Sequence, residues 1–199
     1  MKKLKYILLY LFLFISFIEK SLADDIKDFE IEGISIGDSL LKYYAKEDII
    51  NAPITHYPSG NKDFKEITIL SKKSEKYEAF GFAIKNKDNS YKIYQMKGML
   101  EFNNRFEECM QERDLIVKEI SEITSEKNKK VYVNNFRNSV GDSKAHIVDF
   151  IFNNGKIRVW CTKWDRNNER VKAEDWADTL NVDASTLEYL KWLRTKAYE

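Results

Sequence analysis

Cys161, His146 and Asp149 are the side-chain types of a nucleophilic catalytic set, in which a thiolate attacks, an imidazole carries the proton and a carboxylate orients the imidazole. The residues around His146 alternate as in a β-strand, and this places His146 and Asp149 on opposite faces. A second cysteine, Cys109, offers the Cys161 thiol a disulfide partner instead. The chain has no G-x-S-x-G pattern and no glycine-rich phosphate loop. We therefore predict no catalytic residue.

Metal ligands are sparse in this sequence. The only histidines are His56 and His146, which are far apart and form no pair at helix or hairpin spacing. Transition-metal sites draw on clustered histidine, cysteine and carboxylate side chains. We therefore expect no metal and no cofactor.

Carboxylates are plentiful and leave a second hypothesis open. A glycoside hydrolase needs two carboxyl groups that face each other across about 5–9.5 Å, and sequence spacing does not report that distance. Glu169, Glu174 and Asp175 lie near two tryptophans, Trp164 and Trp176, which makes this segment the first place to look for such a pair. The alternative function is a small hydrolase that acts on envelope or carbohydrate material. A solvated loop is the competing interpretation.

Three other side chains are candidate ligand-binding residues. Trp160 and Trp164 fall on one face of a predicted strand and would give a sugar, a peptide or a partner protein a flat apolar platform. If a helix covers that face, both are core residues instead. Arg113 interrupts the apolar stripe of a predicted helix, where its guanidinium would extend outward to solvent, form a salt bridge with a buried carboxylate or bind an anionic ligand.

The two cysteines predict one disulfide. Apolar residues recur at helical spacing over residues 104–123, and Cys109 lies on that stripe. Cys161 lies on a strand over residues 156–164, on the face of Ile157 and Val159. On the chain-entropy model, a bridge that closes this loop stabilises the fold by about 4 kcal/mol. Two separate buried thiols are the alternative.

The remaining elements predict an α+β fold. Alternating segments at 64–70, 78–85, 91–102, 131–136, 144–153, 156–164 and 178–183 read as strands, with the dipeptide Asn154-Gly155 as the hairpin between the fifth and sixth. A short helix follows Asp38, and a terminal helix follows the capping box of Ser185 and Glu188. We expect helix–meander–helix–meander–helix, with six to seven antiparallel strands and the helices on one side.

The first 23 residues have the layout of a signal peptide. Lys2, Lys3 and Lys5 precede an apolar run at 6–18, and Ser21 and Ala23 are small residues at a cleavage site. A membrane-spanning helix needs about 20 apolar residues, so a retained anchor is the weaker alternative. We expect cleavage after Ala23, a single domain at 24–199, a periplasmic or secreted location and no membrane anchor after cleavage.

Charge narrows the choice of partners. The full chain carries +1 and residues 1–23 contribute four lysines and one glutamate, so the remainder carries −2. A dedicated nucleic-acid binder normally shows a concentrated basic footprint, so we expect no nucleic acid. We expect a non-catalytic domain that binds an envelope protein or a small ligand.

Two segments carry a resemblance to known proteins. The opening at 31–41, with Gly33, Gly37 and Asp38, and the later Gly141-Asp142-Ser143 with the strand at 159–164 resemble a group of small exported proteins of AT-rich marine alphaproteobacteria, whose function is unknown. The resemblance implies an exported α+β domain. A fainter similarity is to small envelope-assembly modules of the outer-membrane lipoprotein type, in which a helix opened by glycine packs on an antiparallel meander. The lipid-attachment cysteine of those modules is missing here.

Overall fold

The computed structural model describes residues 25–55, 57–60, 62–71, 74, 76–124, 128–136 and 140–198. The predicted leader, with its cleavage site after Ala23, lies outside these residues. Within the described part of the chain, no helix is long and apolar enough to cross a membrane.

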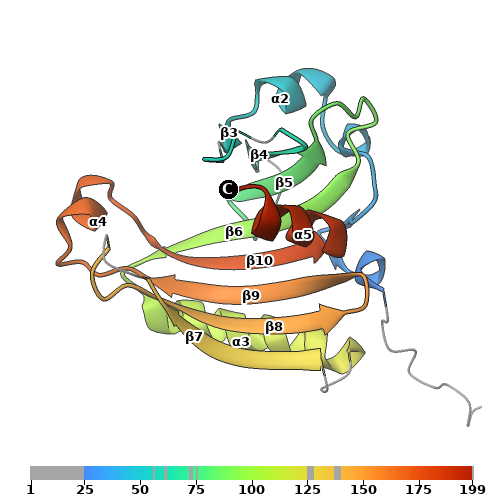
Figure 1. Ribbon diagram of the computed structural model, residues 1–199. Coiled ribbons are helices and arrows are strands. Elements are labelled where there is room, and N and C mark those ends of the chain that lie inside the picture. The colour runs from blue at the N-terminus through green and yellow to red at the C-terminus, as the bar shows by residue number, and fades with distance from the viewer. Residues whose placement is uncertain are drawn as a thin grey trace, which may run out of the picture.

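The elements follow the predicted order closely (Figure 1). The helices are α2 (Lys46–Asn51), α3 (Phe106–Ile123), α4 (Glu169–Ala173) and α5 (Leu187–Thr195), with the short 3-10 helices η1 (Ile26–Asp28) and η2 (Leu40–Lys42). The strands are β1 (Glu30–Ile31), β2 (Ile34–Ser35), β3 (Ile54–Thr55), β4 (Phe64–Leu70), β5 (Ala79–Lys85), β6 (Ile93–Asn103), β7 (Lys129–Asn135), β8 (Lys144–Phe152), β9 (Gly155–Lys163) and β10 (Asp178–Thr186).

One antiparallel sheet dominates the fold. Its strand order is β3-β4-β5-β6-β10-β9-β8-β7, and β1 and β2 pair separately. The predicted α+β class with antiparallel pairing is confirmed, and β10 joins the two meanders by pairing with β6 on one side and β9 on the other. The expected count of six to seven strands was too low, because the sheet has eight. The strand that the prediction missed is β3, whose two residues are too few to show alternation.

The prediction that all helices lie on one side of the sheet is wrong, because α3 and α5 cover opposite faces. Phe82 and Ala83 are neighbours on β5 and therefore point to opposite faces. Phe82 belongs to the apolar core that α3 covers, whereas Ala83 packs in a cluster with Tyr189 and Trp192 of α5. Figure 1 shows α3 behind the sheet and α5 in front of it.

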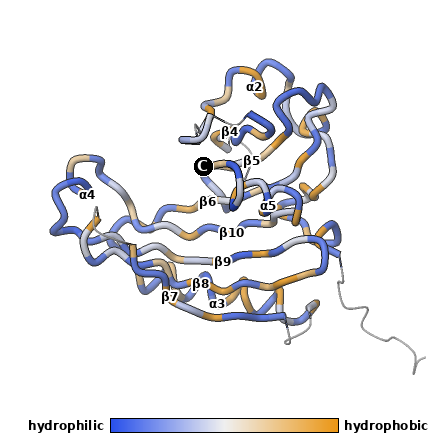
Figure 2. The backbone as a smooth tube through the Cα atoms, in the orientation of Figure 1, coloured by the Kyte–Doolittle hydropathy of each residue, from blue (hydrophilic) through white to orange (hydrophobic). Residues whose placement is uncertain are grey.

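The α3 face of the sheet holds the main core. Ile116 and Ile120 of α3 pack among inward-facing residues such as Phe150, Val159 and Leu180. Figure 2 shows apolar residues that recur along α3 and along the strands of the sheet. Such a recurrence places the apolar side chains of each element on one side, where they can be buried. The hydrophobic effect therefore holds α3 against the sheet.

The predicted disulfide is confirmed. Cys109 of α3 and Cys161 of β9 are bonded, with their Cα atoms 6.0 Å apart. Both side chains are fully buried in the α3-face core. The bond therefore joins α3 to β9, an inner strand of the sheet.

The β8–β9 hairpin differs from its prediction. Phe152 pairs with Gly155, so the turn residues are Asn153 and Asn154 and not Asn154-Gly155. Gly155 is needed for space: a Cβ there would lie 2.4 Å from the carbonyl oxygen of Ser185. The Asn154 side chain accepts from the backbone N–H of Ile26 at 3.2 Å, so the hairpin tip also holds the start of the described chain.

Candidate functional site

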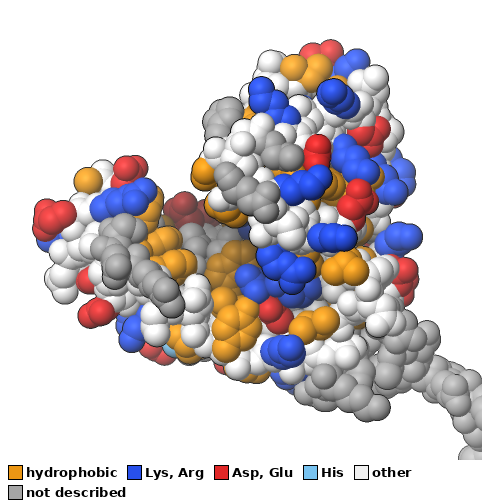
Figure 3. Space-filling model, viewed as in Figure 1, with side chains coloured by type: hydrophobic (Ala, Val, Ile, Leu, Met, Phe, Trp, Pro, Cys, Tyr) orange, Lys and Arg blue, Asp and Glu red, His pale blue; other side chains and the backbone are white. Residues whose placement is uncertain are grey.

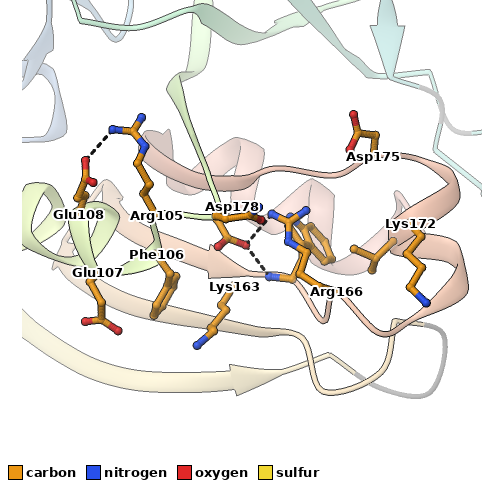
Figure 4. Close-up of a pocket in the computed structure, with 12 residues that line it drawn as sticks. Arg105, Phe106, Glu107, Glu108, Lys163, Arg166, Lys172, Asp175 and Asp178 are labelled. Atoms are coloured by element: carbon orange, nitrogen blue, oxygen red, sulfur yellow. Dashed lines mark hydrogen bonds and ion pairs between the residues drawn. The ribbon is translucent and has the colours of Figure 1, made fainter.

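Two adjoining hollows lie at the end of the sheet where α3 begins. The first, which we call the basic groove, encloses about 690 Å³, and the second, the α4 groove, encloses about 720 Å³. Both are lined by the same four side chains: Phe106, Lys163, Trp164 and Arg166. Figure 4 shows the α4 groove, with Phe106 coming from α3, Lys163 from β9 and Arg166 from the segment that follows β9.

A pair of lysines defines the basic groove. Lys144 opens β8 and Lys163 closes β9, and the two residues stand directly opposite each other in the strand pairing. Like charges at such opposed positions repel and lower stability. In the part of the chain that the structure describes, neither lysine forms an ion pair with a carboxylate. The pair therefore concentrates positive charge in a groove that two carboxylates, Asp142 and Asp165, also line.

Aromatic rings form the floor beneath these charges. The Lys163 ammonium lies 5.1 Å from the ring centre of Phe106. His146 meets the same ring edge to face, with 5.3 Å between ring centres. Burial lowers the pKa of His146, and the positive charges of Arg113, Lys144 and Lys163 lower it further. A neutral imidazole at this place keeps a third cation out of the groove near pH 7.

Of the two acidic side chains that line this groove, Asp165 is held by hydrogen bonds within the protein. The Asp165 carboxylate accepts backbone N–H groups of Asn167 at 2.9 Å and Asp142 at 3.1 Å, and these bonds lower its pKa. Gly141 makes this approach possible, because its φ is +62° and a Cβ there would lie 2.1 Å from Asp165 Oδ2. Asp142 remains as an exposed carboxylate on the rim of the basic groove.

Arg166 lines both grooves and is held in place by hydrogen bonds to neighbouring segments. Its guanidinium donates to the carbonyl oxygens of Trp176 at 2.5 Å and Asn103 at 2.9 Å. It also lies 3.4 Å from Asp178, whose carboxylate accepts the backbone N–H of Trp164 at 2.9 Å (Figure 4). These contacts tie three segments together, so Arg166 supports the site.

The two predicted tryptophans lie in different surroundings. Trp164 follows the end of β9 and lines both grooves, where it stacks on Phe136 at 5.3 Å and meets Trp176 at 4.5 Å. Trp160 lies on β9, where it pairs with Ile147 of β8, and it lines neither groove. It is partly exposed on the opposite face of the sheet, which we call the open face.

The third predicted residue, Arg113, is buried on α3. Its Nε and Nη2 donate to the carboxylate of Asp114, and its Nη1 donates to the backbone oxygen of His146 at 3.3 Å. The carboxylate partner is thus an exposed neighbour on the helix, where the sequence interpretation had offered a buried one. Arg113 lines neither groove, but it adds positive charge behind His146.

The acidic segment considered for hydrolysis lies at the α4 groove. Glu169 pairs with Lys172 at 3.0 Å, Glu174 is exposed at the end of α4, and Asp175 lines the groove. Figure 4 shows Asp175 well apart from Asp178, the other aspartate of this lining. Among the described residues, no three histidine, cysteine, aspartate or glutamate side chains cluster as metal ligands would.

The open face carries polar groups that bond one another. Arg158 donates through two nitrogens to the buried Asp149 at 2.7 and 2.9 Å, and the Tyr132 hydroxyl donates to the same carboxylate at 3.0 Å. Asp183 accepts from Gln95 at 2.5 Å and from Ser185 at 2.6 Å. Figure 3 looks onto this face and shows basic and hydrophobic side chains side by side across a hollowed surface.

Of the residues that line the basic groove, only Trp164 was singled out as ligand-binding from the sequence. The residues missed include the four that supply its charges and its aromatic floor: Phe106, Lys144, His146 and Lys163. The signal that could have found the lysine pair is the register of the β8–β9 hairpin, because that register alone sets Lys144 opposite Lys163. Comparisons with protein-family models, curated proteins and solved structures gave no match to this chain.

Proposed function

We propose that this protein is an exported, non-catalytic binding domain that holds a small organic anion in the basic groove. The leader-like sequence at 1–23 and the Cys109–Cys161 disulfide support a periplasmic or secreted location. Membership in the exported alphaproteobacterial group is part of the same proposal.

The opposed Lys144 and Lys163 carry the argument. An anion that lies between the two ammonium groups attracts both and offsets their mutual repulsion, and this favours anion binding by the folded protein. Phe106 and Trp164 add flat apolar surface beside the charges. The ligand class that fits is therefore a planar or ring-containing molecule with a carboxylate, phosphate or sulfonate group.

Calorimetric titration with matched probes tests this proposal. We expect 2-naphthoate to bind about 10-fold more tightly than the uncharged 2-naphthalenemethanol, because a charge-assisted hydrogen bond contributes about 1.5–3 kcal/mol. Lys144→Gln and Lys163→Gln should each remove about that preference, whereas Lys118→Gln, an exposed position on α3 outside both grooves, should leave it unchanged.

A second readout locates the bound anion. The His146 imidazole is held neutral partly by Lys144 and Lys163, so a carboxylate between them should raise its pKa in a proton NMR titration. Equal affinity for the acid and the alcohol would overturn the proposal, as would an unmoved His146 titration at saturating 2-naphthoate. The exported product should begin at Asp24 and lack the two thiol hydrogens, and mass analysis checks both.

A further inference from the structure

The two edges of the main sheet are very different. One edge is β3, which has two residues. The other is β7, which has seven residues and exposes the side chains of Val131, Tyr132 and Val133 by 67%, 38% and 50%. Proteins usually shorten, charge or cover an edge strand, because its backbone groups pair readily with another strand. β7 begins with two lysines, Lys129 and Lys130, but its middle is apolar and exposed, and this central part indicates a pairing surface.

The hydrogen bonds of β7 show which of its residues face outward. The N–H of Phe136, just after β7, donates to the oxygen of Ser143 at 3.1 Å, so residue 136 bonds inward to β8. Bonding direction alternates along an antiparallel strand. The backbone groups of Val131, Val133 and Asn135 therefore point away from the sheet.

We propose that β7 pairs with β7 of a second copy of this chain, antiparallel and centred on Tyr132. This proposal does not rest on the groove's ligand, although Val133 and Asn135 of β7 also line the basic groove. In this register Val131 of each copy exchanges backbone hydrogen bonds with Val133 of the other, which are the residues whose groups point outward. All seven residues of β7 find a partner within β7, and the two Tyr132 side chains face each other across the two-fold axis.

Charge favours a second copy as the occupant. The basic end of β7, Lys129 and Lys130, comes to lie opposite the uncharged end, Asn134 and Asn135. No lysine is then directly opposite a lysine, and the valines and tyrosines meet as apolar and aromatic cross-strand pairs. Antiparallel pairing across a two-fold axis is self-complementary, so it closes as a dimer and does not extend further.

Sedimentation velocity of the oxidised, processed protein tests the association. We expect a concentration-dependent dimer, and we expect Val131→Lys to weaken it by at least about 10-fold, because the lysine replaces the apolar side chain that faces Val133 of the other copy at the centre of the paired region. Val131 lies outside both grooves, so this variant should keep the affinity for 2-naphthoate. A protein that stays monomeric up to its solubility limit would overturn the proposal.

Cysteine crosslinking tests the register. Facing residues of a non-hydrogen-bonded pair have Cα atoms about 4.5 Å apart, which a disulfide spans. Tyr132→Cys should therefore crosslink two copies in air, whereas Lys130→Cys, which faces Asn134 in this register, should not. Equal crosslinking of the two variants would mean random collision, and crosslinking of Lys130→Cys alone would mean a different register. Either result contradicts the proposed pairing.

Discussion

The α3 face and the open face of the sheet bury different chemistry. On the α3 face, apolar side chains surround the disulfide between Cys109 and Cys161. On the open face, Asp149 is buried in a pair with Arg158, and Gln95 is buried beside Asp183. A face held by apolar contacts and a covalent bond tolerates pH change, whereas a face held by buried charges depends on protonation.

The largest expected effect is on the α3 face. Replacing both cysteines, Cys109→Ala with Cys161→Ala, should lower the free energy of unfolding by about 4 kcal/mol, because the open chain gains entropy once the loop is no longer closed. Urea denaturation of the variant measures this loss. The native chain unfolded in the presence of dithiothreitol is the control and should match the variant, since the chain has no other cysteine. If the free energy of unfolding falls by less than about 1 kcal/mol, the disulfide does not make the α3 face the more strongly stabilised of the two faces.

The open face should respond to the loss of a single carboxylate charge. Asp149→Asn should cost about 2 kcal/mol, less than for a fully enclosed pair because Arg158 is partly exposed. Burial raises the pKa of Asp149, but the hydrogen bonds and charge of Arg158 outweigh it and hold that pKa below 3.8. The stabilisation is therefore present above the unfolded-state pKa and is lost as the pH falls through the folded pKa. Denaturation at several pH values checks this, with the exposed Asp142→Asn as control.

The smallest expected effect is a gain in stability. Burial raises the pKa of Asp183, so its contribution falls as the pH rises above the unfolded-state value. Asp183→Asn removes the buried charge and keeps two hydrogen bonds, because the amide oxygen can accept from Gln95 Nε2 while the amide nitrogen donates to the Ser185 hydroxyl oxygen.

We expect Asp183→Asn to add about 1 kcal/mol near pH 7, or about 2–4 °C in Tm. Thermal melts between pH 4 and pH 8 would show a gain that grows with pH and then levels off. A variant that melts below the native protein at pH 7 would show that the Asp183 charge is stabilising. The contributions of Asp149 and Asp183 would then both fall as the pH is lowered.

The disulfide and the sheet could be predicted because they depend on local periodicity. Cys109 shares the apolar stripe of α3, and Cys161 shares the inward face of β9, so each pattern alone indicates where its cysteine points. Periodicity does not say which face of a sheet a helix covers. The placement of α5 opposite α3 depends on Tyr189 and Trp192 packing against Phe64, which no local pattern reports.

The basic groove was missed because of a small error in register. A turn at Asn154-Gly155 would have set Lys144 opposite Asp165, a favourable pair that needs no ligand. The true turn, one residue earlier, sets Lys144 opposite Lys163. The asparagine-glycine signal misled because Gly155 is required by the nearby Ser185 carbonyl, and neither turn residue has a positive φ.

The presence of only two cysteines bears on how the chain matures. With four cysteines three pairings compete, and isomerase enzymes correct the wrong ones. Here the chain can close only one internal ring, that between Cys109 and Cys161. An oxidant alone therefore suffices to form the native bond, and the reduced chain should reoxidise to the Cys109–Cys161 form in full without a disulfide isomerase.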